Sequence, residues 1–291
     1  MLTEMILEKS AEFDFKIVNA KTWTGKTGFH YACMNPFSNI AVMLMQKSNE
    51  LNIKLDTKDV NGWTAFHFAC QNGHLNITEI ILKKCTDIGI ELNAKTDFGL
   101  TAFHLACQYG HLNTSEMILK KSTELNIELD AKDRNWNTPF HLACLQSHLK
   151  IAEMIIEESN ELNIDLNAKN RGGSTAFHHA CQNGQSKVAE LLIKKSVQFK
   201  IDLNARAKYG NTAFHMACME RKSQGKIAKM IIHKSDELKI NLNAKNVTGS
   251  TGFHLACIDG TKNMVKILIE NAVCLSKPHE SIIASKGKTL T

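Results

Sequence analysis

The stretch "TAFHLACQYGH", residues 101–111, decides the fold of this chain, because its opening phrase returns at a fixed interval. Thr-x-Phe-His begins at seven positions, separated by steps of 37, 37, 37, 37, 37 and 39 residues: Thr27, Thr64, Thr101, Thr138, Thr175, Thr212 and Thr251. One match would be weak evidence, whereas seven at nearly constant spacing indicate an internal repeat. The 291-residue chain is therefore predicted to be an array of similar units.

Each unit predicts two helices and an extended return. Thr101 is a favoured N-cap residue, and His104 stands three residues later, where its side chain can reach back to the cap. Gly110 ends the first helix, and a second follows in "LNTSEMILKKSTEL", residues 112–125. The segment 126–133, "NIELDAKD", then alternates apolar and polar residues, which is typical of extended chain. Two short helices cannot bury their apolar faces alone, but stacked neighbours can.

The phrase "TPFHLAC", residues 138–144, is close to the signature Thr-Pro-Leu-His-x-Ala, which recurs with a period of about 33. The inter-helix turn "NGHL", residues 72–75, is also typical of that signature. On these motifs the chain resembles the ankyrin repeat family over residues 1–276. The resemblance implies an all-α solenoid, in which helix-turn-helix-hairpin units stack in one curved array.

The period also predicts the boundaries of the units. We expect a trailing half repeat at 1–21, repeats at 22–58, 59–95, 96–132, 133–169, 170–206, 207–245 and 246–276, and a polar, disordered tail at 277–291. Because "LTEMILEKSAEF", residues 2–13, aligns with second helices, the chain is expected to be a fragment of a longer array, with docking of this helix on a partner as the alternative. Each repeat exceeds the family norm by about four residues, close to one helical turn, so we predict a longer second helix.

Composition limits the class of protein. The 35 Lys and Arg residues face 29 Asp and Glu residues, and a net charge of +6 is too small for a basic nucleic-acid tract. The start "MLTEMILEKS" is not a secretory signal, and no run of about 18 apolar residues could span a bilayer. The nine cysteines cannot all pair internally. We therefore predict an intracellular protein of the cytoplasm or nucleus with reduced thiols.

His104 and Cys107 raise the question of a metal site, since they lie three residues apart on one predicted helix. A zinc site needs about four ligands, and the next repeat's pair lies about 10 Å away, too far for bonds near 2.3 Å. The favoured alternative is that the histidine caps the helix and the cysteine packs as a small apolar residue. We predict no metal and no cofactor.

The same pair could form a nucleophilic dyad, but such a dyad needs a cleft and an orienting third group. Seven identical dyads between stacked helices would be an unusual enzyme, and buried thiols are inert. The segment "GKT", residues 25–27, lacks the glycine that opens a phosphate-binding loop. Lysine pairs such as Lys120-Lys121 on the second helices are balanced by glutamates, as on a solvated face. We therefore predict neither catalysis nor nucleic-acid binding.

The turns that precede each threonine are the predicted contact surface, because the family resemblance makes them hairpin fingers. Tryptophan, tyrosine and arginine dominate interface hot spots. The predicted partner-binding residues are Trp23, Trp63, Phe98, Trp136, Tyr209, Lys26, Arg134, Arg171 and Lys208 in the fingers, and Tyr109 on the concave face. The alternative for the aromatic residues is packing of each finger on the next. Asparagines in "LNAK", such as Asn93 and Asn204, resemble sites of asparagine hydroxylation.

The sequence thus predicts a non-enzymatic scaffold or adaptor that binds protein partners, as a monomer or as part of a longer chain, without inserting into a membrane. Two alternatives remain open. One is a cytosolic ankyrin segment of a larger membrane channel or cytoskeletal anchor. The other is an inhibitor that masks a transcription factor.

Overall fold

The computed structural model describes residues 17–35, 38–259 and 262–271, and all regular elements within them are α-helices. The seven first helices are α2 (Gly28–Met34), α4 (Ala65–Gln71), α6 (Ala102–Tyr109), α8 (Pro139–Leu145), α10 (Ala176–Gln182), α12 (Ala213–Met219) and α14 (Gly252–Asp259). The second helices within the described residues are α3 (Ser38–Gln46), α5 (Leu75–Ile88), α7 (Leu112–Lys121), α9 (Leu149–Glu158), α11 (Ser186–Lys195), α13 (Lys226–Lys234) and α15 (Lys262–Glu270). The predicted all-α solenoid is confirmed.

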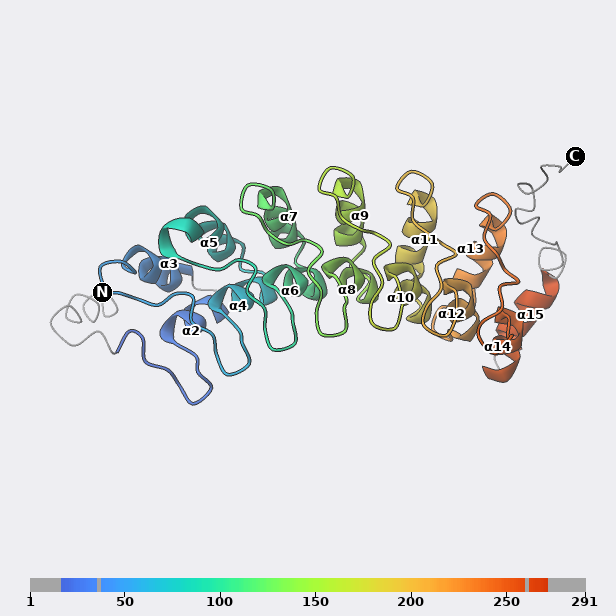
Figure 1. Cartoon of the computed structure of the whole chain (residues 1–291), viewed down its shortest axis with the longest axis horizontal. Helices are drawn as coiled ribbons and strands as arrows, with labels where there is room; N and C mark the ends of the chain where they lie inside the picture. Colours follow the sequence, from blue (N-terminus) through green and yellow to red (C-terminus); the bar gives the residue numbers. More distant parts are fainter. Residues whose placement is uncertain (1–16, 36–37, 260–261, 272–291) are drawn as a thin grey trace, which may run out of the picture. The chain divides into compact units, whose positions relative to one another are not determined.

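Two compact units divide the chain, residues 1–176 and 177–291. In the first unit, the first helices α2, α4, α6 and α8 contact one another in order and form one row (Figure 1). The second helices α3, α5, α7 and α9 form a parallel row, and long loops link each pair of helices to the next. In the second unit, α12 contacts α14, and α11 contacts α13. Each unit is therefore two layers of helices with loops beside them.

The repeated threonine and histidine start the first helices. At α6 the Thr101 side chain accepts a hydrogen bond from the backbone N–H of His104, and the His104 ring accepts one from the backbone N–H of Thr101. This reciprocal pair satisfies two amides that have no partner inside the helix. The helix ends before Gly110, whose φ of 80° lies in the left-handed region. The predicted capping role of the histidine is confirmed.

The first helices form the centre of the core. In α6, the side chains of Phe103, Leu105 and Cys107 are almost fully buried, and Ala106 is inaccessible. The small Ala106 and Cys107 allow neighbouring first helices to approach closely. Isoleucines of the second helices, such as Ile118, complete the packing. Because both neighbours of α6 in the row cover it, even its polar His104 is buried.

The predicted lengthening of the second helix holds in α5 but not in the others. The regular part of α7 ends at Lys121, and a series of hydrogen-bonded turns follows. The hydroxyl of Ser122 donates to the carbonyl of Leu119 at 2.7 Å and so competes with the backbone ladder. A cysteine, Cys85, stands at this place in α5. Its thiol lies 3.6 Å from the corresponding carbonyl, so this hydrogen bond is weaker. That helix continues to Ile88.

A second set of histidines joins successive repeats at the inter-helix turn. The Nε2 atom of His111 lies 2.7 Å from the carbonyl oxygen of Gln71, forty residues earlier. His148 makes the same bond to Gln108 at 2.9 Å. Its ring lies so close to Gly110 that a Cβ there would overlap it, which is why this turn needs glycine. The predicted half repeat at the start lies largely outside the described residues, and the predicted tail lies wholly outside them.

Candidate functional site

The buried histidines connect the first helices α2 to α12 to the loop of the repeat that follows. The Nδ1 atom of His104 accepts from the backbone of Thr101, which leaves the proton on Nε2. Nε2 lies 3.0 Å from the carbonyl oxygen of Asn137 in the next repeat and donates to it. Distances of 3.0–3.2 Å separate the equivalent pairs His30–Trp63, His67–Leu100 and His141–Ser174 in the first unit, and His178–Asn211 and His215–Ser250 in the second.

This environment keeps the rings neutral. Burial lowers the pKa of His67 and His104 from 6.5 to about 4, and the hydrogen bonds to the next repeat oppose the shift only in part. A ring with both nitrogens bonded and no charge at neutral pH can neither ligate a metal nor act as a general base without unpacking the repeat. The histidines therefore act as scaffold.

The repeated cysteines are equally enclosed. Cys70, Cys107 and Cys144 are inaccessible, and burial raises the pKa of each thiol far above its ordinary value. A thiol held protonated is a poor nucleophile and a poor metal ligand. Within residues 17–35, 38–259 and 262–271, no group of three or more histidine, cysteine or acidic side chains is placed to hold a metal ion.

The finger tips are turns of defined geometry. In the fourth repeat, Asp133 Oδ1 accepts from the backbone N–H groups of Asn135 and Asn137, at 2.8 and 2.7 Å. The backbone N–H of Arg134 donates to the carbonyl of Phe98 in the preceding tip at 2.8 Å. Equivalent bonds within the first unit are Val60 to Thr24, Asp97 to Asn61 and Arg171 to Asn135. The tips of this unit are thus tied side by side into one backbone ladder.

Three of the predicted finger residues in the first unit present large apolar surface to solvent. Trp23 is fully exposed, Phe98 is 60% exposed and Trp136 is 50% exposed. The guanidinium of Arg134 lies 5.7 Å from the centre of the Phe98 ring, and the ammonium of Lys132 lies 5.5 Å from that of Trp136. Cations over aromatic faces hold these rings in place without covering them fully.

Trp63 and Lys26 are placed differently, at the base of the fingers. The Trp63 ring stacks on Phe68 with ring centres 4.9 Å apart. Lys26 pairs with the buried carboxylate of Asp59 at 3.2 Å and lies over the same Phe68 ring. These contacts favour the packing alternative for these two residues.

The remaining predicted residues are accessible. Arg171 lies exposed at a tip of the first unit. Tyr209 in the second unit is 63% exposed, with the Lys208 ammonium 5.9 Å from its ring centre. Tyr109 ends α6, and its hydroxyl accepts a hydrogen bond of 3.1 Å from the Gln71 amide.

The turn register separates the three tryptophans. Trp23 is the second residue of its turn, a position called the outer corner from here on. Trp63 follows the turn glycine, and Trp136 replaces that glycine with a φ of 64°. Two exposed valines, Val60 and Val247, share the outer-corner position of Trp23 and were not predicted as contacts. Aligning the repeats at steps of 37 and 39 residues would have found them, since the spacing alone fixes this register.

Comparison with known families decides the classification. The family described as "Ankyrin repeats (3 copies)" matches residues 2–96, 87–170 and 160–246. The chain belongs to the ankyrin repeat family. Among solved structures, this ankyrin array is similar to the ankyrin repeat domain of Bcl-3, described as a unique member of the IκB protein family. The two share 19% identity with a TM-score of 0.66, over 84% of this chain and 99% of that one, which supports the fold alone. No curated protein matches the sequence.

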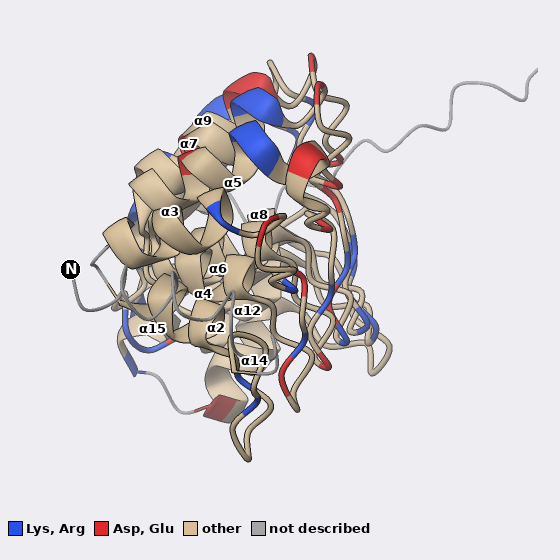
Figure 2. Ribbon diagram, turned by 90° about the vertical axis from the view of Figure 1, so that its left-hand side faces the viewer, with Lys and Arg blue, Asp and Glu red and all other residues tan. Residues whose placement is uncertain are grey.

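Charge is distributed unevenly over the ankyrin helices of the first unit. The first helices α4, α6 and α8 carry no Lys, Arg, Asp or Glu, whereas the second helices α5, α7 and α9 and the loops carry both signs (Figure 2). Along the loops, Lys58 lies 3.9 Å from Glu91, and Lys95 lies 3.7 Å from Glu128. No helix in the described part of the chain is long and apolar enough to cross a membrane.

Proposed function

We propose that this ankyrin chain is a non-enzymatic protein-interaction scaffold, and that the finger tips of its first unit bind an extended polypeptide segment that carries apolar and acidic side chains. The observation that carries the proposal is the exposure of Trp23, Val60 and Phe98 on adjacent tips. Large apolar side chains that gather on a surface are typical of interaction sites. The backbone ladder between the tips limits the entropy that ordering them on binding would cost.

The cations beside these residues favour acidic groups in the partner. Arg134 and Arg171 occupy successive outer corners, and both are exposed. An arginine can bind a carboxylate through two parallel hydrogen bonds, which gives direction as well as attraction. Repeats that stack about 10 Å apart match three residues of extended chain at about 3.3 Å each. An acidic residue at every third position would therefore meet successive corners.

The exposed acids of the same loops argue against a nucleic acid as the partner. Glu91, Glu128 and Asp165 recur beside the basic positions, and a tip of the first unit also carries Asp97. A nucleic acid bears one negative charge at each phosphate and would be repelled by every one of these carboxylates. A polypeptide can place neutral or basic residues opposite them.

Tyr109 offers a second contact, because it is 49% exposed at the end of a first helix. A partner segment that runs from the tips to the C-terminal ends of the first helices would contact this tyrosine. We propose this as an extension of the tip surface, with the cytoplasm or nucleus as the compartment. An inhibitor that masks a transcription factor would be one form of such a scaffold. An ankyrin segment of a larger membrane or cytoskeletal protein would be another.

Selection of random peptides against the full chain tests the proposal. We expect the enriched peptides to combine aromatic or branched apolar residues with Asp and Glu. They should bind Trp23→Ala and Phe98→Ala variants about tenfold or more weakly, the size typical of hot-spot truncations. Val197→Ala is the matched control, since this 75% exposed side chain follows α11 and belongs to no tip.

Equal binding of the enriched peptides to wild type and both tip variants would contradict the tip surface. Preferential binding of single-stranded oligonucleotides, in competition with the peptides, would contradict the partner class.

A further inference from the structure

One side chain in the return segment of the second repeat ties it to the third. The side-chain amide of Asn93 donates to the carbonyl oxygen of Asn126 at 2.8 Å, and its oxygen accepts from the backbone N–H of Glu128 at 2.9 Å. Asparagine suits this place because one end of its amide donates while the other accepts. The asparagine is thus an inter-repeat bridge.

The second unit repeats the arrangement. Asn204 donates to the carbonyl oxygen of Lys239 at 3.0 Å and accepts from the backbone N–H of Asn241 at 2.8 Å. In both bridges the accepting carbonyl belongs to a residue in the left-handed conformation, with φ of 50° at Asn126 and 51° at Lys239. The geometry is therefore a fixed feature of the return.

In the third repeat, an aspartate, Asp130, takes the place of this asparagine, 37 residues after Asn93. Its Oδ2 accepts from the backbone N–H of Asp165 at 2.8 Å, as the asparagine oxygen would. Its Oδ1 is buried and has no hydrogen-bond partner in the described part of the chain. Asn163 has a φ of 54°, the conformation of Asn126. The register therefore directs Oδ1 at the carbonyl oxygen of Asn163, acceptor against acceptor.

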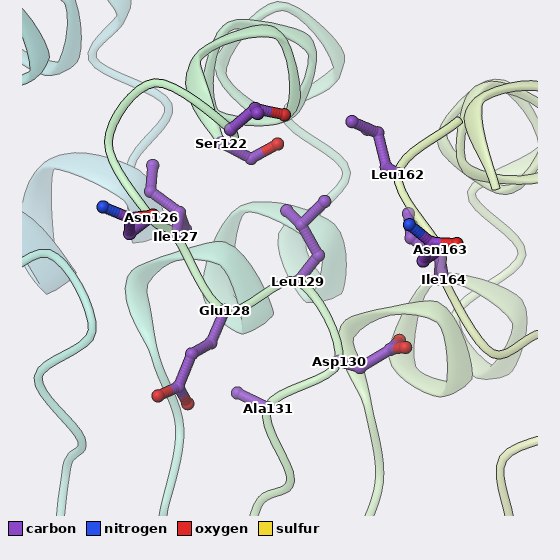
Figure 3. A pocket seen from close by; sticks show the side chains of 11 residues that line it. Ser122, Asn126, Ile127, Glu128, Leu129, Asp130, Ala131, Leu162, Asn163 and Ile164 are labelled. Carbon is purple, nitrogen blue, oxygen red and sulfur yellow. The ribbon is translucent and has the colours of Figure 1, made fainter. Parts of the chain in front are cut away.

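The carboxylate lies at one end of a pocket of ≈ 590 Å³ between the third and fourth repeats. Figure 3 shows the Asp130 side chain turned toward the segment that carries Asn163 and Ile164. The second unit has the corresponding pocket, of ≈ 330 Å³, and Asn204 lines it in the place of Asp130. The two pockets differ at this position in the group that faces the neighbouring carbonyl.

The surroundings of Asp130 shift its pKa in opposite directions. Burial, the largest cause, raises the pKa above its ordinary 3.8, and the carboxylate of Asp165 adds to this. The backbone N–H of Asp165 and the side chain of Lys132 lower it. The folded protein therefore binds this proton more tightly than the unfolded chain does.

We propose that the junction between the third and fourth repeats is an acid-tightened joint, in which protonated Asp130 donates a hydrogen bond to the carbonyl of Asn163. Ionised Asp130 leaves its buried Oδ1 without a hydrogen-bond partner, opposite the carbonyl oxygen of Asn163, which is costly. The bond is fully present below the ordinary pKa of aspartate and is lost as pH rises through the raised pKa. At neutral pH this junction opens more readily than the asparagine junction at Asn93. The joint does not depend on the proposed partner surface.

Hydrogen exchange of the full chain measures how readily this junction opens. The amide of Ile164 bonds within its own repeat, to the carbonyl of Ser159, so its protection reports opening without direct contact with Asp130. At pH 7.5, Asp130→Asn should lower the opening equilibrium constant by about two- to tenfold, the range of one hydrogen bond. This gain in protection of the Ile164 amide should shrink steadily as the pH falls toward 4. A gain that is equal at every pH, or absent at pH 7.5, would overturn the proposal.

The reverse substitution is the matched control. Asn204→Asp should create the same defect in the second unit, with faster exchange of Ile240 at pH 7.5 and recovery toward pH 4. Asp165→Asn separates the hydrogen bond from charge repulsion, because the Asp130→Asn gain should persist in that background. Loss of the gain there would assign the effect to repulsion and overturn the bond.

Discussion

The ring of His104 donates from Nε2 to the carbonyl oxygen of Asn137, 33 residues later, at 3.0 Å. One side chain thereby caps its own helix and fixes the loop of the next repeat. Such a bridge couples local helix formation to stacking, which makes neighbouring repeats cooperative. It also explains why histidine recurs, because a ring with an acceptor at one nitrogen and a donor at the other meets both needs.

His104→Ala should destabilise the first unit by about 2–4 kcal/mol, since it removes the cap and the bond to Asn137 and leaves a cavity in the buried site. Urea denaturation followed by circular dichroism measures the change. His254→Ala is the matched control, because this exposed histidine caps α14 through Thr251 and makes no cross-repeat bond in the described residues. Its cost should stay near 1 kcal/mol. Equal losses in the two variants would argue against the bridge.

Stability should fall as the solution becomes acidic. The folded pKa of His104 is lowered from 6.5 to about 4, so the unfolded chain binds more protons between these values. The stabilisation is present above pH 6.5 and is lost as pH falls toward 4, by about 3 kcal/mol for such a residue. Urea midpoints measured from pH 7.5 to pH 4.5 check this. His104→Gln should flatten the slope, and an unchanged slope would contradict the assignment.

Trp136→Gly should separate stability from binding. Trp136 holds a φ of 64° where other repeats have glycine, a conformation that costs a bulky residue about 1–2 kcal/mol. We expect thermal stability to rise by about 1 kcal/mol and affinity for the selected peptides to fall about tenfold. Lower stability would mean that the cation-bound ring contributes to folding.

Gly99→Ala is the mirror control for that position. A Cβ at Gly99 would lie 2.9 Å from the backbone nitrogen of Arg134, and its φ is 76°. The variant should therefore lose about 1–3 kcal/mol of stability. A neutral result in thermal unfolding would show that the tip backbone can relax.

The sequence predicted what lies within one repeat. The cap at Thr101, the buried Cys107 and the turn at Gly110 depend on neighbours a few residues away, so spacing and residue type were enough. The helix pairs and their stacking followed from the constant period.

Contacts between repeats were harder to predict. The acceptor of His104 and the orphan oxygen of Asp130 depend on the register of the next repeat, 33 to 35 residues on. The shorter regular part of α7 came from the hydroxyl of Ser122, which helix periodicity does not weigh. Trp63 was predicted as a contact residue like the other two tryptophans, but its place in the turn register stacks it on Phe68.

The three tryptophans offer the most direct test of the central claim, that repeated residues build the scaffold and the tips bind. Each indole N–H gives its own signal in a ¹⁵N-correlated spectrum of the full chain. On addition of a selected peptide, the signals of Trp23 and Trp136 should shift, whereas that of Trp63, packed on Phe68, should stay in place. Saturable binding with Trp23 and Trp136 unmoved would contradict the account.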